Sequence, residues 1–133
     1  MGVLWALNHG LESRSKRMAA VHGVTGPQRL VVRIVGRRPG ISAGELAEAM
    51  RLHPSTLTGI VRRLVERRLI ERRGDPSDRR RALFRLTERG KKIDELRTGT
   101  VEAAIRSALR RFGDEDIEAA KALLATITKN LED

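Results

Sequence analysis

The middle of the chain, residues 53–86, changes from a helical to an alternating pattern of apolar residues. In its first part, apolar residues recur at intervals of three and four, at Leu57, Ile60, Val61, Leu64 and Val65. This spacing gives one apolar face and predicts a helix over about residues 54–67. The residues off that face are small and polar at first and cationic farther along.

A β-hairpin is predicted over residues 69–86. Two short, partly alternating runs, 69–73 and 82–86, are separated by Gly-Asp-Pro-Ser-Asp, which is dense in turn-forming residues. Its tip is expected to carry Arg79, Arg80 and Arg81. A helix with a small polar face, followed by an arginine-tipped hairpin, is suited to entering the major groove of DNA while holding the neighbouring groove.

Helices are also predicted before this segment. Residues 3–22 form the first one, which ends at Gly23. The segments Thr25–Gln28 and Ser42–Glu45 have the spacing of capping boxes, so each of them opens a further helix. The earlier of these two helices runs to about Arg37. Their inward residues are expected to be Leu30, Val31, Ile34, Val35, Leu46, Ala47 and Met50.

Two amphipathic helices are expected after the hairpin. Thr87 caps a long helix over Glu88–Arg111, which would be about 35 Å long at 1.5 Å per residue. Gly99 is a weak point or kink within it, because glycine is unfavourable in a helix interior. Asp114 caps the last helix.

The order of these elements predicts a mainly α fold with a small β-hairpin wing. Residues 25–87 have the succession of a winged helix-turn-helix, with the recognition helix at about 54–67 and the wing at about 69–86. The winged helix-turn-helix of residues 25–87 is small and offers the terminal helices little surface to pack against. Residues 1–24 and 88–133 are therefore expected to form a dimerisation domain, and the chain is expected to be a homodimer.

The positive charge of the chain is concentrated in one segment. Residues 51–92 hold 14 Lys and Arg against five Asp and Glu, a net charge of +9 out of +10 for the whole chain. A diffuse charge would suggest only solubility or weak binding to polyanions. A focused one is an electrostatic footprint for phosphates and makes double-stranded DNA the expected partner.

Composition excludes several other classes of protein. The chain has no cysteine, which rules out disulfides, thiolate metal sites and cysteine catalysis. No apolar stretch is long enough for a membrane span, and the N-terminal cations follow the apolar residues, against the order of a secretory signal. A cytoplasmic protein is expected. His9 and His22 lack a second ligand at metal spacing, and no nucleophile–base pair or phosphate loop is present, so no metal, no cofactor, no catalytic residue and no enzymatic activity are expected.

Two stretches, STLTGIVRRLVERRLIERR (55–73) and DPSDRRRALFRLTERGKK (75–92), resemble one family when taken together. They are similar to the recognition helix, the Asp-Arg-Arg wing and the Leu-Thr-Glu-x-Gly helix entry of the MarR (multiple antibiotic resistance regulator) family. The resemblance covers nearly the full length. It implies a dimeric helical body with two winged heads that binds palindromic DNA as a transcriptional regulator, expected here to be a repressor. Many members release DNA on binding small aromatic or phenolic ligands.

The pattern and the resemblance together give a set of candidate DNA-binding residues. Short hydroxyl side chains near the start of the recognition helix can approach base edges or phosphates, and arginine forks match paired acceptors on guanine or phosphate. The set is Ser42, Ser55, Thr56, Thr58, Gly59, Arg62, Arg63, Arg73, Asp78, Arg79, Arg80 and Arg81.

Three of these assignments have simpler alternatives. By resemblance, Asp78 orients Arg80, which enters the minor groove; otherwise Asp78 is only a turn residue. Ser42 holds a phosphate through backbone N–H groups at a helix N-terminus, or it is only a cap. The arginines of the recognition helix contact DNA, or they are a solvated face.

The sequence departs from the family pattern at two positions. Gly59 stands where the family usually has a long polar or basic side chain, so one base-reading contact is lost or replaced. Arg68 stands where the family often has a glycine that ends the recognition helix. If that position still needs a positive φ, arginine costs about 1 kcal/mol or more there.

An effector, if there is one, is expected by family analogy where the first helix and the long helix after the hairpin meet the DNA-binding head. Trp5, His9, Met18 and His22 are candidates to line that pocket, although a core or dimer-interface role is the simpler one for most of them. Two rival functions remain. One is DNA binding without ligand control, and the other is a winged helix that docks a protein partner.

Overall fold

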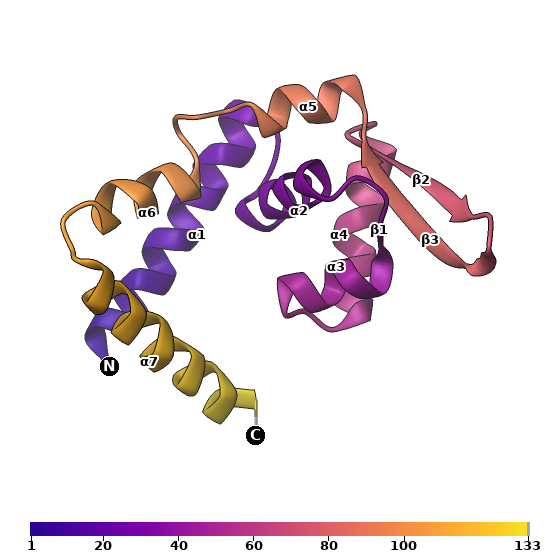
Figure 1. Ribbon diagram of the computed structural model, residues 1–133. Helices are drawn as coiled ribbons and strands as arrows, with labels where there is room; N and C mark the ends of the chain where they lie inside the picture. The colour runs from indigo at the N-terminus through magenta and orange to yellow at the C-terminus, as the bar shows by residue number, and fades with distance from the viewer. Residues whose placement is uncertain (133) are drawn as a thin grey trace. The chain divides into compact units, whose positions relative to one another are not determined.

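The computed structural model describes residues 1–132 and divides into two compact units. The first unit comprises residues 1–100, and the second begins at Val101. The elements of the first unit are α1 (Gly2–His22), α2 (Gly26–Arg37), β1 (Ile41–Ser42), α3 (Ala43–Met50), α4 (Pro54–Glu66), β2 (Ile70–Asp75), β3 (Asp78–Leu86) and α5 (Glu88–Asp94) (Figure 1). Those of the second unit are α6 (Val101–Leu109) and α7 (Asp114–Glu132).

The first unit confirms the predicted winged helix-turn-helix. The central helix is α2, which packs against α1, α3, α4, α5 and β3 (Figure 1). Its buried side chains Val31, Val32 and Val35 form the middle of an aliphatic core. Leu46 of α3 and Leu64 of α4 are completely buried in that core. Burial of apolar area of this kind is the main term that stabilises such a small domain.

The prediction for the inner face of α2 was wrong at one position. Leu30 is 43% exposed, whereas Val32 is completely buried. The two residues are a little over half a helical turn apart, so the buried face is rotated from the one that the sequence suggested. The reason is that α2 is surrounded by several elements and buries a wider arc than a surface helix does.

Both predicted capping boxes are present. At the start of α2, Thr25 Oγ1 accepts a hydrogen bond from the N–H of Gln28 at 3.3 Å, and Gln28 Oε1 accepts one from the N–H of Thr25 at 3.1 Å. At the start of α3, Ser42 and Glu45 make the same reciprocal pair, at 3.3 and 2.9 Å. Each box satisfies two backbone N–H groups that a helix end leaves without a partner.

The sheet has one strand more than the sequence predicted. The strand order is β1–β3–β2, and all pairs are antiparallel. The added strand, β1, is only two residues long; Ile41 pairs with Phe84, and Ser42 pairs with Leu83. A two-residue strand has no alternation to detect, so a sequence pattern could not reveal it.

The hairpin turn lies within the predicted stretch Gly74–Asp78, and the wing arginines follow directly after it. The strand β3 begins at Asp78, and the turn is Pro76–Ser77. The register is broken beside this turn, because Gly74 pairs with Ala82 whereas Asp75 pairs with Asp78. The three arginines between these two pairs, residues 79–81, therefore have no Cα partner on β2. This irregularity makes them a bulge at the outer end of the hairpin.

The predicted long helix over residues 88–111 is broken. The helix α5 ends at Asp94, and Gly99 has a φ of +71° before α6 begins. Arginines from α2 hold the end of α5: Arg29 donates to the carbonyl of Ile93 and, at 2.8 Å, to that of Leu96. Arg33 binds the Asp94 carboxylate at 2.9 Å and its carbonyl at 3.2 Å. Cations at a helix C-terminus satisfy its free carbonyls and favour its negative end, so α5 stops there.

The second unit is helical and has little buried surface. Three acidic residues, Asp114, Glu115 and Asp116, lie in the first turn of α7, where the helix dipole favours negative charge. Asp114 is the first residue of that helix, not the cap before it as predicted. Several large apolar residues are exposed on this unit: Ile105, Leu109, Phe112, Leu123, Leu124 and Leu131. Over residues 1–132, each helix is too short or too polar to cross a membrane.

The turn from the recognition helix into the sheet contains the predicted backbone strain. Arg68 has a φ of +56°, in the left-handed region that favours glycine. Its carbonyl oxygen accepts a hydrogen bond from the Thr87 hydroxyl at 2.6 Å. Thr87 also caps α5, because its oxygen accepts from the N–H of Gly90 at 3.1 Å. One threonine thus ties the strained turn to the start of the next helix.

Gly90 completes this junction because it has no side chain. A Cβ at this position would lie 2.0 Å from the carbonyl oxygen of Leu69, a backbone atom that has little freedom to move. The glycine of the Leu-Thr-Glu-x-Gly stretch is therefore required by the close approach of α5 to the backbone at Leu69. Gly59 is different, because a Cβ there would meet nothing within 4 Å.

These two glycines make a matched pair for a stability measurement. Gly90→Ala should lower the free energy of unfolding by about 1–3 kcal/mol, because the new methyl group overlaps the backbone. Gly59→Ala should raise it by roughly 0.5–1 kcal/mol, since alanine is the better helix former and has room. Urea denaturation of both variants measures the difference, and equal effects of the two substitutions would contradict this account of the junction.

Candidate functional site

Helix α4, the predicted recognition helix, buries its apolar side in the core and exposes its polar side to solvent. Leu57, Val61 and Leu64 are buried at 7% exposure or less. Because these residues fix the rotation of α4, its polar residues are directed outward. The exposed ones are Ser55, Thr56, Thr58, Arg62 and Arg63. The structure therefore brings all five candidate residues with functional side chains on this helix to one surface.

The start of α4 has a cap that the sequence did not suggest. His53 is the N-cap: its Nδ1 accepts a hydrogen bond from the N–H of Ser55 at 3.2 Å. The same nitrogen lies 2.7 Å from Ser55 Oγ. The Thr58 hydroxyl donates to the carbonyl of Pro54 at 2.8 Å, which leaves its oxygen as an acceptor. The hydroxyl groups of this first turn are thus held in place before any partner arrives.

Gly59 leaves an opening on the exposed side of α4. A depression of about 310 Å³ lies between this part of the helix and the start of α2, lined by Thr25, Pro27, Gln28, Thr56, Gly59, Ile60, Arg62 and Arg63. Nothing in the fold requires glycine there, because an added Cβ has open space. The departure from the family pattern is therefore a gap in the polar surface.

Asp78 contacts Arg80 through the backbone. Its Oδ1 accepts a hydrogen bond from the N–H of Arg80 at 2.9 Å. The expectation was that Asp78 orients the Arg80 side chain; within the described chain, no hydrogen bond or ion pair to the Arg80 guanidinium is recorded. The carboxylate thus shapes the turn, and the exposed guanidinium is available to a partner. Arg73 pairs with Glu71 of the same strand at 3.3 Å.

Among the wing arginines, Arg81 forms ion pairs with two carboxylates, those of Glu45 and Asp75. Its guanidinium lies 3.3 Å from Glu45 of α3 and 3.8 Å from Asp75 at the hairpin turn. Glu45 also pairs with Arg38 at 3.3 Å. Sequence reasoning missed this cluster, because its members are far apart along the chain and surface charges show no periodicity. The sequence drew attention to Glu45 only as part of a capping box, and that role gave no reason to expect further partners.

The acidic residues of the cluster have lowered pKa values. The pKa of Glu45 lies below its ordinary value mainly because the backbone N–H and then the hydroxyl of Ser42 donate to it, with Arg81 and Arg38 adding attraction. The pKa of Asp75 is lowered by the hydroxyl and N–H of Ser77 and, more weakly, by Arg81. Both carboxylates are therefore charged at neutral pH and can hold a cation.

Ser42 has a geometry that favours the simpler of its two expected roles. It is 4% exposed, its hydroxyl donates to Glu45 Oε2 at 2.7 Å, and its N–H donates to the same oxygen at 2.9 Å. The Glu45 carboxylate therefore already occupies the place where an anion would bind at this helix start. Ser42 acts in this structure as the cap of α3.

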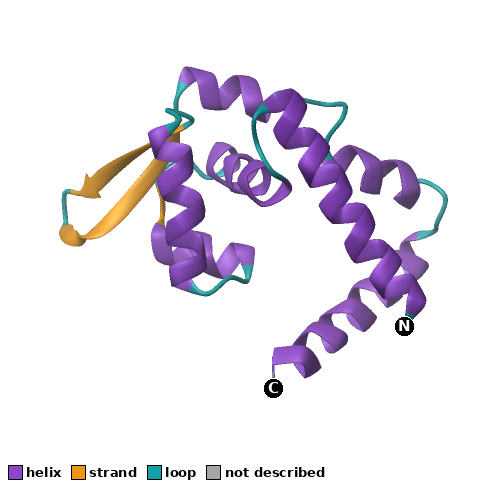
Figure 2. Ribbon diagram, turned by 180° about the vertical axis from the view of Figure 1, so that it is seen from behind, coloured by secondary structure: helices purple, strands orange, loops and turns teal. Residues whose placement is uncertain are grey.

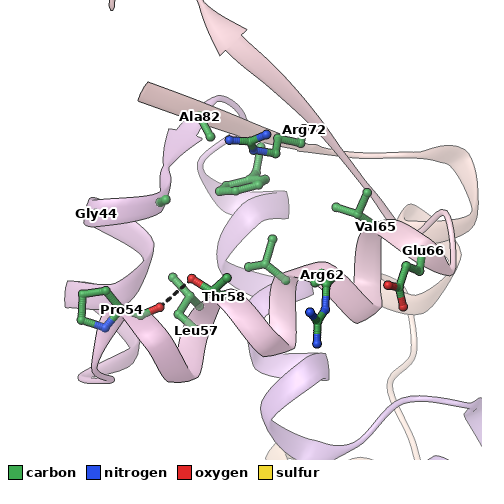
Figure 3. Close-up of a pocket in the computed structure, with 12 residues that line it drawn as sticks. Gly44, Pro54, Leu57, Thr58, Arg62, Val65, Glu66, Arg72 and Ala82 are labelled. Atoms are coloured by element: carbon green, nitrogen blue, oxygen red, sulfur yellow. Dashed lines mark hydrogen bonds between the residues drawn. The ribbon is translucent and has the colours of Figure 1, made fainter. Parts of the chain in front are cut away.

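The four candidate effector residues on α1 differ in their exposure to solvent. Met18 is 1% exposed and belongs to the core, whereas Trp5 is 68% exposed. His9 is exposed, and His22 is partly buried. A cavity does exist between α4, the start of α3 and the hairpin, with a volume of about 450 Å³ (Figure 3). Its wall is mostly apolar, with Leu57, Val61 and Phe84, and polar groups at its rim come from Thr58, Arg62 and Arg72.

Comparison with known proteins agrees with the fold and finds similarity to one family over part of the chain. Residues 22–81 match the MarR family model. The chain is 39% identical over 70 residues to the transcriptional regulator HosA of Escherichia coli O111:H-, an alignment that covers 53% of this chain and 52% of HosA. It is 36% identical over 93 residues to the HTH-type transcriptional repressor NicR of Pseudomonas putida KT2440, covering 59% of each protein.

The same architecture is present in a solved structure of a DNA complex. The crystal structure of the S. aureus MepR–DNA complex superposes with a TM-score of 0.80 at 21% identity, covering 97% of this chain and 95% of that one. The chain is thus similar to MarR-family proteins over residues 22–81, and to this structure in its fold. The alignments with HosA and NicR span only slightly more than half of each relative.

The lowered pKa of Glu45 predicts how acid affects the stability of this protein. A carboxyl group whose pKa is lowered by folding stabilises the folded state above its unfolded pKa, and this contribution is lost as pH falls through the folded value. Wild type should therefore lose more stability than Glu45→Gln between about pH 5 and about pH 3. Urea denaturation at several pH values measures this, with Glu48→Gln on the same helix as the control for net charge. Parallel pH profiles for wild type and Glu45→Gln would be evidence against a role of this carboxylate in stability.

Proposed function

We propose that this protein is a transcriptional repressor that binds a palindromic operator in double-stranded DNA as a homodimer. In each subunit, α4 enters the major groove, and the hairpin reaches the adjacent minor groove. The observation that carries the proposal is the common exposure of the polar side of α4 and of the arginines beside the hairpin turn. Figure 2 shows α4 running alongside the hairpin, and residues 51–92, which contain both elements, have a net charge of +9.

The side chains on this surface suit different parts of a DNA duplex. Ser55, Thr56 and Thr58 are short and lie at the start of α4, so they can approach base edges closely. Arg62 and Arg63 lie farther along the helix and are suited to phosphates or to a guanine. Arg79 and Arg80 are exposed at the outer end of the hairpin, where an arginine can enter a narrow minor groove.

Exposed apolar side chains support the homodimer. The helix α1 leaves Val3, Trp5, Leu7 and Val21 exposed, at 48–83% of their surface. The second unit also exposes large apolar side chains over α6 and α7. Exposed apolar surface is unfavourable in water, and large patches of it mark protein interfaces. A second copy of the chain would bury these faces and would present two heads to one duplex.

We further propose that a small aromatic or phenolic effector releases the DNA. The apolar cavity between α4 and the hairpin has a suitable volume, and its rim carries Thr58 and Arg62, which belong to the proposed DNA-binding surface (Figure 3). A ligand there would contact groups that also contact DNA. This location is favoured over the α1 residues, because Met18 is packed in the core and Trp5 faces solvent.

Selection of bound sequences from random duplexes by the purified protein tests the function directly. The expected result is one palindromic sequence whose half-sites are about one helical turn apart, because a dimer presents its two heads at a fixed spacing. Titration of the selected duplex with small aromatic compounds then tests release. A subunit that stays single in solution and shows no preference among duplexes would reject the proposal.

Loss of the hairpin contact should weaken binding without affecting the fold. Arg80→Ala should weaken binding to the selected duplex by about 1–3 kcal/mol, because this exposed side chain is proposed to enter the minor groove. Fluorescence anisotropy measures the affinity. The control is Arg85→Ala, which removes the same charge from the same strand at an exposed position near its other end. Equal losses for the two variants would show that only overall charge matters.

A further inference from the structure

The outer part of the hairpin is weakly fixed by the sheet. The short strand β1 pairs with β3 at Leu83 and Phe84. The part of β3 nearer the turn, from Asp78 to Ala82, therefore lies outside the three-stranded part of the sheet. In that outer part, the pairing between β2 and β3 is also broken by the register shift next to Gly74. Main-chain hydrogen bonding alone therefore leaves the direction of the hairpin tip free to vary.

One arginine connects this outer part to the helical body. Arg81 extends from β3 so that its guanidinium lies 3.3 Å from Glu45 Oε2 on α3. Another nitrogen of the same guanidinium lies 3.8 Å from Asp75 at the turn. The side chain of Asp75 is only 12% exposed, so this contact is partly shielded from water. The guanidinium of Arg81 on β3 thus connects Asp75, on the other side of the turn, to Glu45 at the start of α3.

The helical end of this connection is itself held firmly. Glu45 Oε2 accepts hydrogen bonds from the Ser42 N–H at 2.9 Å and from its hydroxyl at 2.7 Å. Its other oxygen pairs with Arg38 at 3.3 Å. The next residues of α3, Leu46 and Ala47, are buried. Glu45 is therefore a fixed point relative to the core, and through the core relative to α4, against which α3 packs.

We propose that Glu45 is a positioning residue for DNA recognition: through Arg81, it sets the angle of the hairpin relative to the recognition helix α4. This inference rests on the proposed function. Contacts in the major and the minor groove are made together only if the hairpin and α4 have the spacing of adjacent grooves. Holding that geometry before binding avoids the cost of ordering the hairpin on DNA.

The proposed role predicts a change in DNA affinity opposite to the one expected when a carboxylate near DNA is removed. A negative charge on a surface that faces phosphates weakens binding, so its removal should strengthen binding to all duplexes. If Glu45 positions the hairpin, its removal should instead weaken binding to the selected operator. The two effects can be separated by comparing the operator with a random duplex.

The variant Glu45→Gln is suited to this test, because it keeps the cap and removes the charge. Gln28 already makes an equivalent capping box with Thr25 at the start of α2 in this chain. Glutamine at residue 45 can therefore still accept from the Ser42 N–H, while its ion pairs to Arg81 and Arg38 are lost. The matched control is Glu48→Gln, which removes an exposed carboxylate from the same helix. In the described part of the chain, no ion pair from Glu48 to the hairpin is recorded.

The readout is the affinity of the full-length protein for the selected operator and for a random duplex. Glu45→Gln should weaken operator binding by about tenfold, since two heads each lose an exposed ion-pair cluster. Its affinity for the random duplex should stay equal or rise. Glu48→Gln should leave the ratio of the two affinities unchanged. Operator binding by Glu45→Gln that equals or exceeds wild type, or an equal loss in Glu48→Gln, would overturn the proposal.

A second variant, Arg81→Gln, by itself covers the case in which Glu45→Gln does not fold: it should lose more affinity for the selected operator than for the random duplex, and an equal loss for both would overturn the proposal. Arg81→Gln removes the same connection without touching the cap. In a double-mutant cycle, the combined variant should lose less operator affinity than the sum of the two single losses, in free energy, if the residues act through each other. Additive losses would show that Arg81 acts on DNA independently. Wild type that selects no sequence would reject the proposed function itself, whereas a selective wild type with an unaffected Glu45→Gln would reject only this inference.

Discussion

The buried apolar edge of α4 is the constraint on which the proposed DNA-binding surface depends. Leu57, Val61 and Leu64 lie against the core around α2, and they fix both the position and the rotation of the helix. Since these three residues recur at intervals of four and three, every polar residue between them is directed to the opposite side. The hydroxyl and arginine side chains therefore form one surface as a direct result of core packing.

Features set by neighbours in the sequence could be predicted, and features set by distant contacts could not. The capping boxes at Thr25 and Ser42 follow from local chemistry, whereas the positive φ of Arg68 was expected from the family resemblance. The end of α5 depends instead on Arg29, more than 60 residues away from Ile93, whose carbonyl it binds. The pair of Arg81 and Glu45 spans 36 residues. No periodicity records such contacts, because each of them is decided by the final packing of the helices.

The same division applies to the candidate site. The polar residues of α4 could be identified from their spacing, because it repeats with the helix. The cavity beneath the hairpin could not, since its wall combines Leu57, Val61 and Phe84 from elements that meet only in the folded chain. The location expected on α1 was inferred by analogy, and the structure places Met18 in the core and Trp5 in solvent.

The opening at Gly59 has a consequence for how this kind of protein diverges. When a residue contributes to both folding and function, a substitution that alters its function also changes the stability of the fold. At Gly59, the backbone is ordinary helix and the space beside it is empty. After gene duplication, a single codon change can therefore add a side chain to the proposed DNA-binding surface while the core stays as it is. The position is a ready route by which one copy acquires a different set of target genes.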